Sequence, residues 1–459
     1  MADASLSPKV LKAVAGRLQT TNADLTRRYP GDIGTRQPVH TVYGGAHLFT
    51  FDTAQKLGRV ALRALEEYAP DSEQLASAVG LADEQLAAHV HGRIFTKLQS
   101  EPVEDFRIDF EDGYGVRPDA EEDGHAASVA NEVARGMRDR TLPAFVGIRI
   151  KPLSAELYAR SLRTLDIFMT TLVGGTRQSA GSGQRIGLLP PNWVVTLPKI
   201  THPDQVSAFV DALEALEKKL GLDEGALRFE AMIETPQLIM NAEGRSALPA
   251  LIDAGRGRLV AAHFGTYDYT AALNITAAHQ RMRHPACDFA RHVMQVAYAG
   301  TGVWLSDGST TVMPVPVHRV SGGGSLTDKQ EAENRASVHR AWRLHYDDVR
   351  HSLSTGFYQG WDLHPAQLVT RYTAVYTFFL EGIEAAAARL RNFLAKAAQA
   401  TLVGDVFDDA ATGQGLLNFF LRGINSGALS EAEAGAMIDL TADELRTRSF
   451  TKILAGRRK

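Results

Sequence analysis

Short apolar runs of the kind found in β-strands alternate along this chain with longer segments whose apolar residues recur at helical spacing. Eight strand-like runs can be distinguished, at residues 41–49, 106–112, 144–150, 193–199, 228–234, 258–265, 310–317 and 357–364. Repetition of strand and helix over this length predicts an α/β protein with a (β/α)8, or TIM, barrel. An open, doubly wound sheet is the competing architecture.

The same pattern divides the chain into three parts. We predict an N-terminal helical arm at 1–40, a catalytic TIM barrel at 41–370 and a helical C-terminal region at 371–459, in which 374–399 is the clearest helix. The C-terminal region is a candidate cap or oligomer contact, and we expect a homo-oligomer.

Insertions interrupt the pattern at three places, 70–104, 174–187 and 321–325. The last two are rich in glycine and serine but lack the Lys-Ser/Thr of a P-loop and the spacing of a dinucleotide fingerprint. We therefore predict a flexible loop at 174–187, and a linker or a lid at 321–325.

Composition narrows the class of protein. The chain has 459 residues, a formal charge of -4, 44% hydrophobic and 22% charged residues, as soluble globular proteins do. A single cysteine, Cys287, excludes an intramolecular disulfide and a zinc site of several thiolates, which favours a cytoplasmic protein. Neither a signal peptide nor a membrane span is expected, and positive charge is too scattered to favour nucleic-acid binding.

Charged side chains gather where the predicted strands end. In 106–112, alternation places Arg107, Asp109 and Glu111 on one face, with Asp112 at the exit. Because chemistry in a TIM barrel sits at the carboxyl ends of the strands, we expect one shared site there. The other polar residues at or just after strand ends are Arg149, Lys199, Glu234, Asp268 and His364.

A buried cluster of carboxylates needs a compensating charge, supplied either by Arg and Lys side chains or by a divalent cation. Hard oxygen ligands with few nearby histidines favour Mg2+, with Mn2+ as the alternative. We choose Glu234 and Asp268 as the metal ligands. Structural ion pairs are the competing interpretation.

Six motifs, in order along the chain, resemble those of the HpcH/HpaI aldolase / citrate lyase beta-subunit-like family, which includes malyl-CoA lyase, in the pyruvate/phosphoenolpyruvate barrel superfamily. They are IDFEDGYGVRPDAEED (108–123), VGIRI (146–150), TLPKI (196–200), AMIETPQLIMNAEG (231–244), HFGTYDYTAAL (263–273) and GWDLHPAQL (360–368). The GTYDY part of the fifth motif is closer to malate synthase.

The resemblance implies a Mg2+-dependent enzyme that makes or breaks a carbon–carbon bond through an enolate. By position, Glu234 and Asp268 hold the metal and Arg149 binds the keto-acid or carbonyl oxygen. Glu111 and Asp112 then orient Arg149 or metal-bound waters. The alternatives are that Arg149 only neutralises the acids, and that Glu111 and Asp112 cap the loop after their strand.

The remaining residues are assigned more simply. Lys199 is a further substrate-binding candidate whose side chain points either into the mouth or into water. We expect His364 to bond a neighbouring backbone carbonyl and fix the last loop. No general base is assigned; Asp439, in AGAMIDL, matches a C-terminal acid of some relatives only slightly. The other histidines singled out are expected at the surface or in helices: His279, His284, His292, His339 and His345.

The resemblance leaves two substrate classes open, a 3-hydroxyacyl-CoA thioester and a free hydroxy-keto acid. CoA binding is the less supported, because GGAHLFTFDTAQK (44–56) departs from the family's usual first-strand motif and 70–104 is inserted after it. A malate-synthase-like condensation is the alternative activity. A barrel that serves only as a binding or assembly subunit is the alternative of another class.

Overall fold

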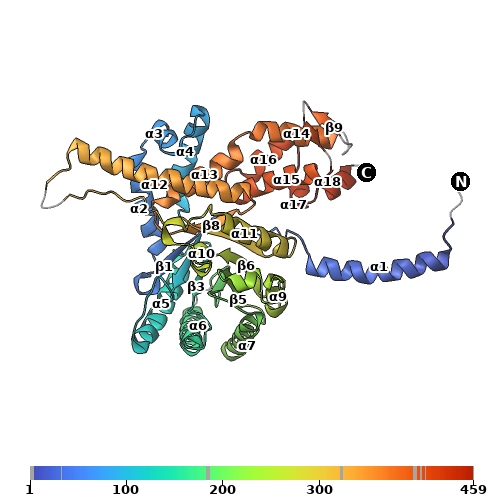
Figure 1. Cartoon of the computed structure of the whole chain (residues 1–459), viewed down its shortest axis with the longest axis horizontal. Helices are drawn as coiled ribbons and strands as arrows, with labels where there is room; N and C mark the ends of the chain where they lie inside the picture. Colours follow the sequence, from blue (N-terminus) through green and yellow to red (C-terminus); the bar gives the residue numbers. More distant parts are fainter. Residues whose placement is uncertain are drawn as a thin grey trace.

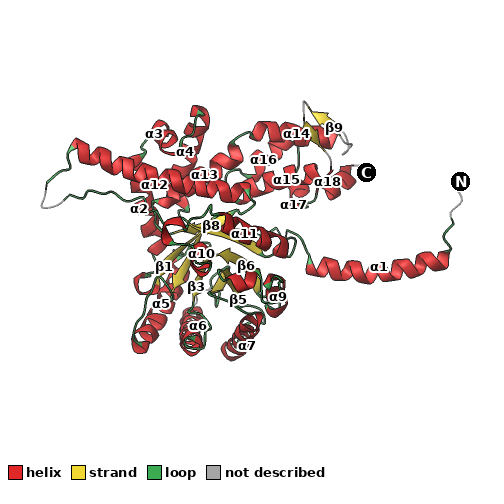
Figure 2. Ribbon diagram, viewed as in Figure 1, coloured by secondary structure: helices red, strands yellow, loops and turns green. Residues whose placement is uncertain are grey.

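The computed structural model describes residues 5–32, 34–181, 187–320, 324–395, 401–403, 406–408 and 410–457. Eight parallel strands form a closed barrel in chain order, with helices packed around it (Figures 1 and 2). The predicted TIM barrel is therefore confirmed, and the open sheet is excluded. The strands are β1 (His40–Gly45), β2 (Asp105–Asp109), β3 (Phe145–Arg149), β4 (Trp193–Leu197), β5 (Arg228–Ile233), β6 (Leu259–Phe264), β7 (Trp304–Ser309) and β8 (Gln359–Asp362).

Helices connect successive strands and cover the outside of the barrel. The principal ones are α2 (Thr53–Tyr68), α5 (Asp119–Asp139), α6 (Tyr158–Gly181), α7 (Pro203–Leu220), α9 (Leu248–Ala254), α11 (Pro285–Tyr298), α12 (Asp328–Ser354) and α13 (Gln367–Leu380). Shorter elements follow individual strands: η1 (Ala46–Leu48), α8 (Pro236–Ile239), α10 (Thr266–Ala272) and η2 (Ala277–His279). The insertion at 70–104 contains α3 (Ser72–Val79) and α4 (Glu84–Ser100), which pack on each other and on α12 and α13.

The barrel interior carries a buried ionic layer. Arg107 donates to Asp105 (2.7 Å) and to both carboxylate oxygens of Glu230 (2.8 and 3.1 Å). The guanidinium fits because residue 147 is glycine: a Cβ there would lie 2.9 Å from Nη1 of Arg107 and 2.1 Å from the carbonyl oxygen of Val194. Charged groups that are paired in this way can be buried.

The remaining helices form a separate layer and an arm. A second apolar core joins α14 (Ile383–Ala395), α15 (Ala410–Asn425), α16 (Glu431–Ile438), α17 (Ala442–Arg446) and α18 (Phe450–Arg457). A short antiparallel pair, β9 (Thr401–Val403) and β10 (Val406–Asp408), lies between α14 and α15 in the chain. Helix α1 (Pro8–Arg28) projects from the barrel (Figure 1). Within the described residues, no helix is long and apolar enough to span a membrane.

Three sequence predictions about elements need correction. The seventh strand is β7 and not 310–317, which is irregular because Pro314 and Pro316 lack the N–H that a sheet needs. The segment predicted as one helix at 374–399 is divided between α13 and α14 by Gly382, whose φ is +68°. Its last residues, 396–399, lie outside the described part of the chain. The loop predicted at 174–187 is helical up to residue 181, as the end of α6; residues 182–186 and 321–323 lie outside the described part of the chain.

Candidate active site

The predicted site residues come together at the carboxyl-terminal mouth of the barrel. Arg149 is the last residue of β3, and the other residues come directly after strands or in the first turn of the next helix. Ion pairs link all of these side chains except that of Glu234, whose carboxylate accepts the backbone N–H of Lys199. The structure therefore brings these residues together at one mouth, as predicted. The residues are Glu111, Asp112, Arg149, Lys199, Glu234 and Asp268.

Asp109 fixes the position of Arg149. Its carboxylate accepts from Nε (2.8 Å) and Nη2 (2.6 Å) of the arginine and also from the backbone N–H of Glu111 (2.9 Å) and Gly113 (2.7 Å). A Cβ on Gly113 would lie 2.6 Å from Asp109 Oδ2, so glycine is needed for this close approach. Sequence reasoning did not assign Asp109 to the site, although alternation had placed it on the same face as Glu111.

Glu111 connects the two cations of the mouth. Its Oε2 lies 3.0 Å from Nη1 of Arg149, and its Oε1 accepts from the ammonium of Lys199. Burial raises the pKa of the Glu111 carboxyl, and the attraction of Arg149 opposes this shift. Asp112 is 61% exposed and lies 3.2 Å from Nζ of Lys199 and 3.8 Å from Arg149. Glu111 is therefore part of the buried network, and Asp112 lies at its rim.

The side chain of Lys199 points into the mouth of the barrel and not into water. Its backbone has φ +50°, a conformation that non-glycine residues adopt mainly where the surrounding structure holds them. Its ammonium faces Glu111, Asp112 and, at 3.8 Å, Asp268. Burial lowers the pKa of Lys199, but Glu111 and the other acids more than offset this, so the pKa lies above its ordinary value. Lys199 is therefore a protonated cation.

Glu234 is the most perturbed acid of the mouth. It is 2% exposed, and its Oε1 accepts the backbone N–H of Lys199 at 2.7 Å. Burial raises the pKa of Glu234 to about 8, with Asp268 and Glu111 adding to the shift. A Cβ on Gly265 would lie 2.4 Å from Glu234 Oε2, so the start of the loop after β6 must be glycine to admit this side chain.

The donor set fits a hard divalent cation that takes most of its ligands from water and substrate. Two carboxylates from neighbouring strand ends contact the same residue: Glu234 accepts the backbone N–H of Lys199, and Asp268 lies 3.8 Å from its ammonium group. Mg2+ typically uses one or two protein carboxylates. Across the described residues, no group of three or more His, Cys, Asp or Glu side chains is arranged to hold a metal. The magnesium ligands remain a prediction, which the position of the two acids and the raised pKa of Glu234 support.

His364 differs from expectation, whereas His345 lies in a helix as expected. Nδ1 of His364 accepts from the backbone N–H of Ala366 (3.2 Å) and does not bond a carbonyl; it still fixes the loop before α13. His345 lies on α12 as a helix residue but is buried and pairs with the carboxylate of Asp362 (3.0 Å), a contact between barrel and helix that its spacing in the sequence did not indicate.

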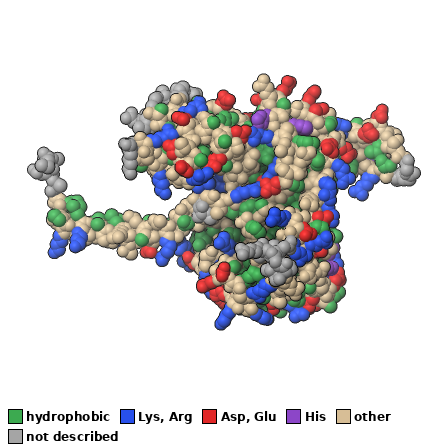
Figure 3. All heavy atoms as spheres, turned by 180° about the vertical axis from the view of Figure 1, so that it is seen from behind, with side chains coloured by type: hydrophobic (Ala, Val, Ile, Leu, Met, Phe, Trp, Pro, Cys, Tyr) green, Lys and Arg blue, Asp and Glu red, His purple; other side chains and the backbone are tan. Residues whose placement is uncertain are grey.

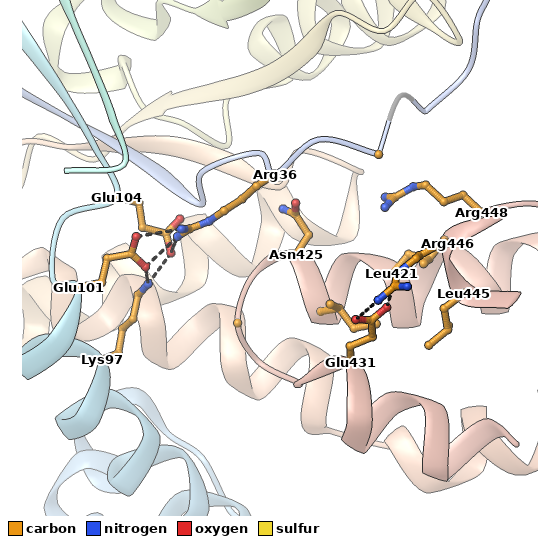
Figure 4. A pocket seen from close by; sticks show the side chains of 13 residues that line it. Arg36, Lys97, Glu101, Glu104, Leu421, Asn425, Glu431, Leu445, Arg446 and Arg448 are labelled. Carbon is orange, nitrogen blue, oxygen red and sulfur yellow. Dashed lines mark hydrogen bonds and ion pairs between the residues drawn. The ribbon is translucent and has the colours of Figure 1, made fainter. Parts of the chain in front are cut away.

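Further cavities lie away from the mouth. Figure 4 shows one of about 390 Å³ between α4 and the C-terminal helices, in which Arg36 pairs with Glu101 (2.8 Å) and Glu104 (3.0 Å). A cavity of about 860 Å³ opens at the amino-terminal end of the strands, with Arg107 in its lining. In TIM barrels the amino-terminal end contributes to stability and the carboxyl-terminal end carries the active site. The mouth therefore remains the candidate site.

Comparison with solved structures finds similar chains. A citrate lyase from Burkholderia xenovorans LB400 aligns over 88% of this chain and 97% of its own, with a TM-score of 0.54 and 18% identity. A malate synthase from Haloferax volcanii aligns over 87% of this chain and 95% of its own, with a TM-score of 0.45 and 14% identity. At this identity the likeness to the citrate lyase shows a shared barrel fold.

Comparison of the sequence gives a family match but no individual curated relative. Membership of the citrate lyase beta-subunit-like family, which the motifs implied, stays a prediction. One family model, described as "Domain of unknown function (DUF6986)", matches residues 18–453, and the chain therefore belongs to that family.

Proposed function

We propose that this protein is a Mg2+-dependent carbon–carbon lyase that acts through an enolate at the carboxyl-terminal mouth of the barrel. The observation that carries the proposal is the state of Glu234, a buried acid with a pKa of about 8 that lies beside Asp268 and Glu111. Two cations, Arg149 and Lys199, do not balance the acids around them. A divalent cation held by Glu234 and Asp268 would do so.

The reaction needs stabilisation of one developing charge. The carbon–carbon bond breaks between a carbon that bears a hydroxyl and the carbon beside a carbonyl. The hydroxyl loses its proton and becomes a carbonyl, while the electron pair of the broken bond moves onto the other carbonyl oxygen as an enolate, which then takes up a proton. Bound at Glu234 and Asp268, Mg2+ would supply a Lewis acid for that oxygen.

Arg149 is suited to orient the substrate. Asp109 occupies the Nε side of the guanidinium, which leaves Nη1 and the second N–H of Nη2 for a carboxylate or a carbonyl oxygen. A guanidinium held on one edge loses little freedom when it binds on another, and two parallel hydrogen bonds orient a carboxylate. Glu111 lies on Nη1 and would be the group that the substrate displaces or shares.

Lys199 is suited to bind anionic oxygen and not to form a Schiff base. Nucleophilic lysines need a lowered pKa, because only the neutral amine attacks a carbonyl. The acids around Lys199 raise its pKa, so its ammonium is a second fixed positive charge in the mouth. This argues for enolate stabilisation by cations in place of covalent catalysis.

The experiment is an assay of the purified protein with Mg2+ and each donor class separately. For a 3-hydroxyacyl-CoA of the malyl type, glyoxylate and CoA thioester are followed, with free thiol as the sign of hydrolysis. For a hydroxy-keto acid, pyruvate and the released aldehyde or keto acid are followed. We expect turnover with one class that EDTA abolishes and Mg2+ restores.

The matched variants are Glu234→Gln and Glu243→Gln, the second being an exposed acid nine residues further along the chain. Only the first should lose turnover and calorimetric Mg2+ binding. A barrel that serves only in binding or assembly would be silent with both donors and would bind Mg2+ no differently in the two variants. That result would refute the lyase.

A further inference from the structure

Helix α1 exposes its apolar residues to solvent. None of its residues is buried, and the helix stands out from the body of the molecule (Figures 1 and 3). Leu11, Leu18 and Leu25 are 52%, 51% and 52% exposed. A single helix of this length is marginally stable in water, and Gly16 inside it lowers its stability further. The helix therefore needs a partner surface.

The spacing of these residues indicates what kind of partner. The three leucines are seven residues apart, and Val14 follows Leu11 by three, so that they line one narrow stripe of the helix. Lys12 and Arg27 lie on the opposite side. A narrow seam with this repeat is typical of packing against other helices.

A matching surface lies at the foot of the arm. A groove of about 410 Å³ runs between α9 and α11, and Arg28 and Tyr29 form part of its edge. Phe289 and Val296 of α11, which line it, are 51% and 82% exposed. Since α1 leads away from this point (Figure 1), the chain's own helix leaves the groove open.

The foot of the arm is anchored beside the groove. Arg28 donates to both carboxylate oxygens of Asp253 (3.1 and 3.2 Å), and Gly31 donates its N–H to the carbonyl of Gly300 (2.8 Å). The direction in which α1 leaves the barrel is therefore set by polar contacts and not by its apolar stripe. The stripe remains available to another molecule.

We propose that α1 is a dimerisation arm whose leucine stripe lies in the α9–α11 groove of a second copy of this chain. One chain carries both surfaces, and a two-fold exchange of arms satisfies both at once. Each arm can be treated as a cylinder about 10 Å wide and about 31 Å long. Burying half of the surface of both arms, and an equal area of the two grooves, removes on the order of 1,900 Å² from water. Stable interfaces bury about 1,200–2,000 Å² in total.

The first test is the mass of the full chain in solution by light scattering. We expect the wild-type protein at twice the 49.9 kDa of one chain and the variant Leu11→Gln/Leu18→Gln/Leu25→Gln at the mass of one. Lys9→Gln/Lys12→Gln, on the other side of the same helix, should remain dimeric. A monomeric wild-type chain, or a dimeric triple-leucine variant, would overturn the proposal.

The second test addresses the groove. Val296→Asp and Phe289→Asp place charges on exposed positions, so folding should be retained, and both should give monomers. If they stay dimeric while the leucine variant is monomeric, the arms pair with each other and the groove assignment is wrong. Flotation with phosphatidylserine vesicles by a monomeric wild-type chain, lost in the leucine variant, would indicate a membrane partner and would also overturn the proposal.

Discussion

The backbone N–H of Lys199 donates to the carboxylate of Glu234 at 2.7 Å, across the ends of β4 and β5. The side chain of the same lysine faces Glu111 and Asp268, so one residue contacts acids that come from three other strand ends. Anything that moves Lys199 or Glu234 therefore changes the charge balance of the whole mouth.

Replacement of Glu234 by Gln should change how stability depends on pH. Because the carboxyl has a pKa of about 8 in the folded chain against 4.5 unfolded, the folded state holds its proton more tightly. Its stabilising contribution is complete below pH 4.5 and is lost as pH rises through 8, by about 1.4 kcal/mol per pH unit at most. Without metal, Glu234→Gln should therefore unfold at higher urea than wild type at pH 8.5, and the difference should vanish near pH 4.5.

Addition of Mg2+ should reduce this difference. The ion selects the ionised carboxylate, so wild type at pH 8.5 should gain about 2.7 kcal/mol at an Mg2+ concentration of 100 times Kd, while Glu234→Gln gains much less. Urea unfolding with Mg2+ and with EDTA measures both effects. Equal stabilisation of the two proteins would show that Glu234 is not a metal ligand.

The strands were predictable wherever burial and β-propensity coincide, as in β3 and β4, whose residues are all buried and mostly β-branched or aromatic. They do not coincide in β7, which contains Ser306, Asp307 and Gly308. Asp307 is tolerated there because Arg291 of α11 pairs with it at 2.8 Å. Arg291 is sixteen residues away in the sequence, and no local sequence pattern indicates that it pairs with Asp307. The valines of 310–317 therefore resembled a strand more than the residues of β7 did, and the seventh strand was predicted at the wrong place.

Asp109→Asn should release Arg149. The carboxylate accepts four N–H groups, and an amide can neither accept them all nor carry the charge that balances the buried guanidinium. Breaking a buried ion pair in this way costs about 3–5 kcal/mol. Urea unfolding should show that loss, and calorimetry with Mg2+ and oxalate should show weaker binding of the dianion.

Asp112→Asn is the matched control for that prediction, since Asp112 follows the same strand but is 61% exposed. Its stability should change by less than about 0.5 kcal/mol. If both variants behaved alike, Asp109 would have no special part in holding Arg149.

Gly265→Ala should disturb Glu234 without removing a functional group. The new Cβ would lie 2.4 Å from Oε2 and 2.5 Å from Cβ of Glu234, so the side chain or the loop must shift. Crowding of this kind in a packed site costs about 1–3 kcal/mol. We expect lower stability together with weaker Mg2+ binding, measured by urea unfolding and calorimetry.

Gly174→Ala provides the comparison, because nothing lies within 4 Å of a Cβ added there and the residue is inside α6. That change should stabilise the chain by up to about 1 kcal/mol and leave Mg2+ binding unchanged. Unaltered Mg2+ binding in Gly265→Ala would indicate that the ion does not depend on the position of Glu234.

The residue types of the site could be read from strand ends, but their partners could not. Sequence order places Glu234 and Asp268 at the same mouth because parallel strands share a direction. It does not say that Asp109, and not Glu111, takes the Nε side of Arg149, since both lie on the same face of the strand. Nor does it show which way Lys199 turns after Pro198, which depends on a left-handed backbone conformation.

Lys199 should not be trapped by borohydride in the presence of pyruvate. Schiff-base formation requires the neutral amine, and the acids around Lys199 keep it protonated by raising its pKa. Intact-mass spectrometry after incubation with pyruvate and sodium borohydride should therefore show no adduct at neutral pH. Lys199→Arg, which keeps the charge, should retain more turnover than Lys199→Met, which leaves Glu111 without one of its two cations. A reduced adduct located at residue 199 by peptide mapping would mean that the lysine is nucleophilic, and that catalysis by cation-stabilised enolate is the wrong description of this mouth.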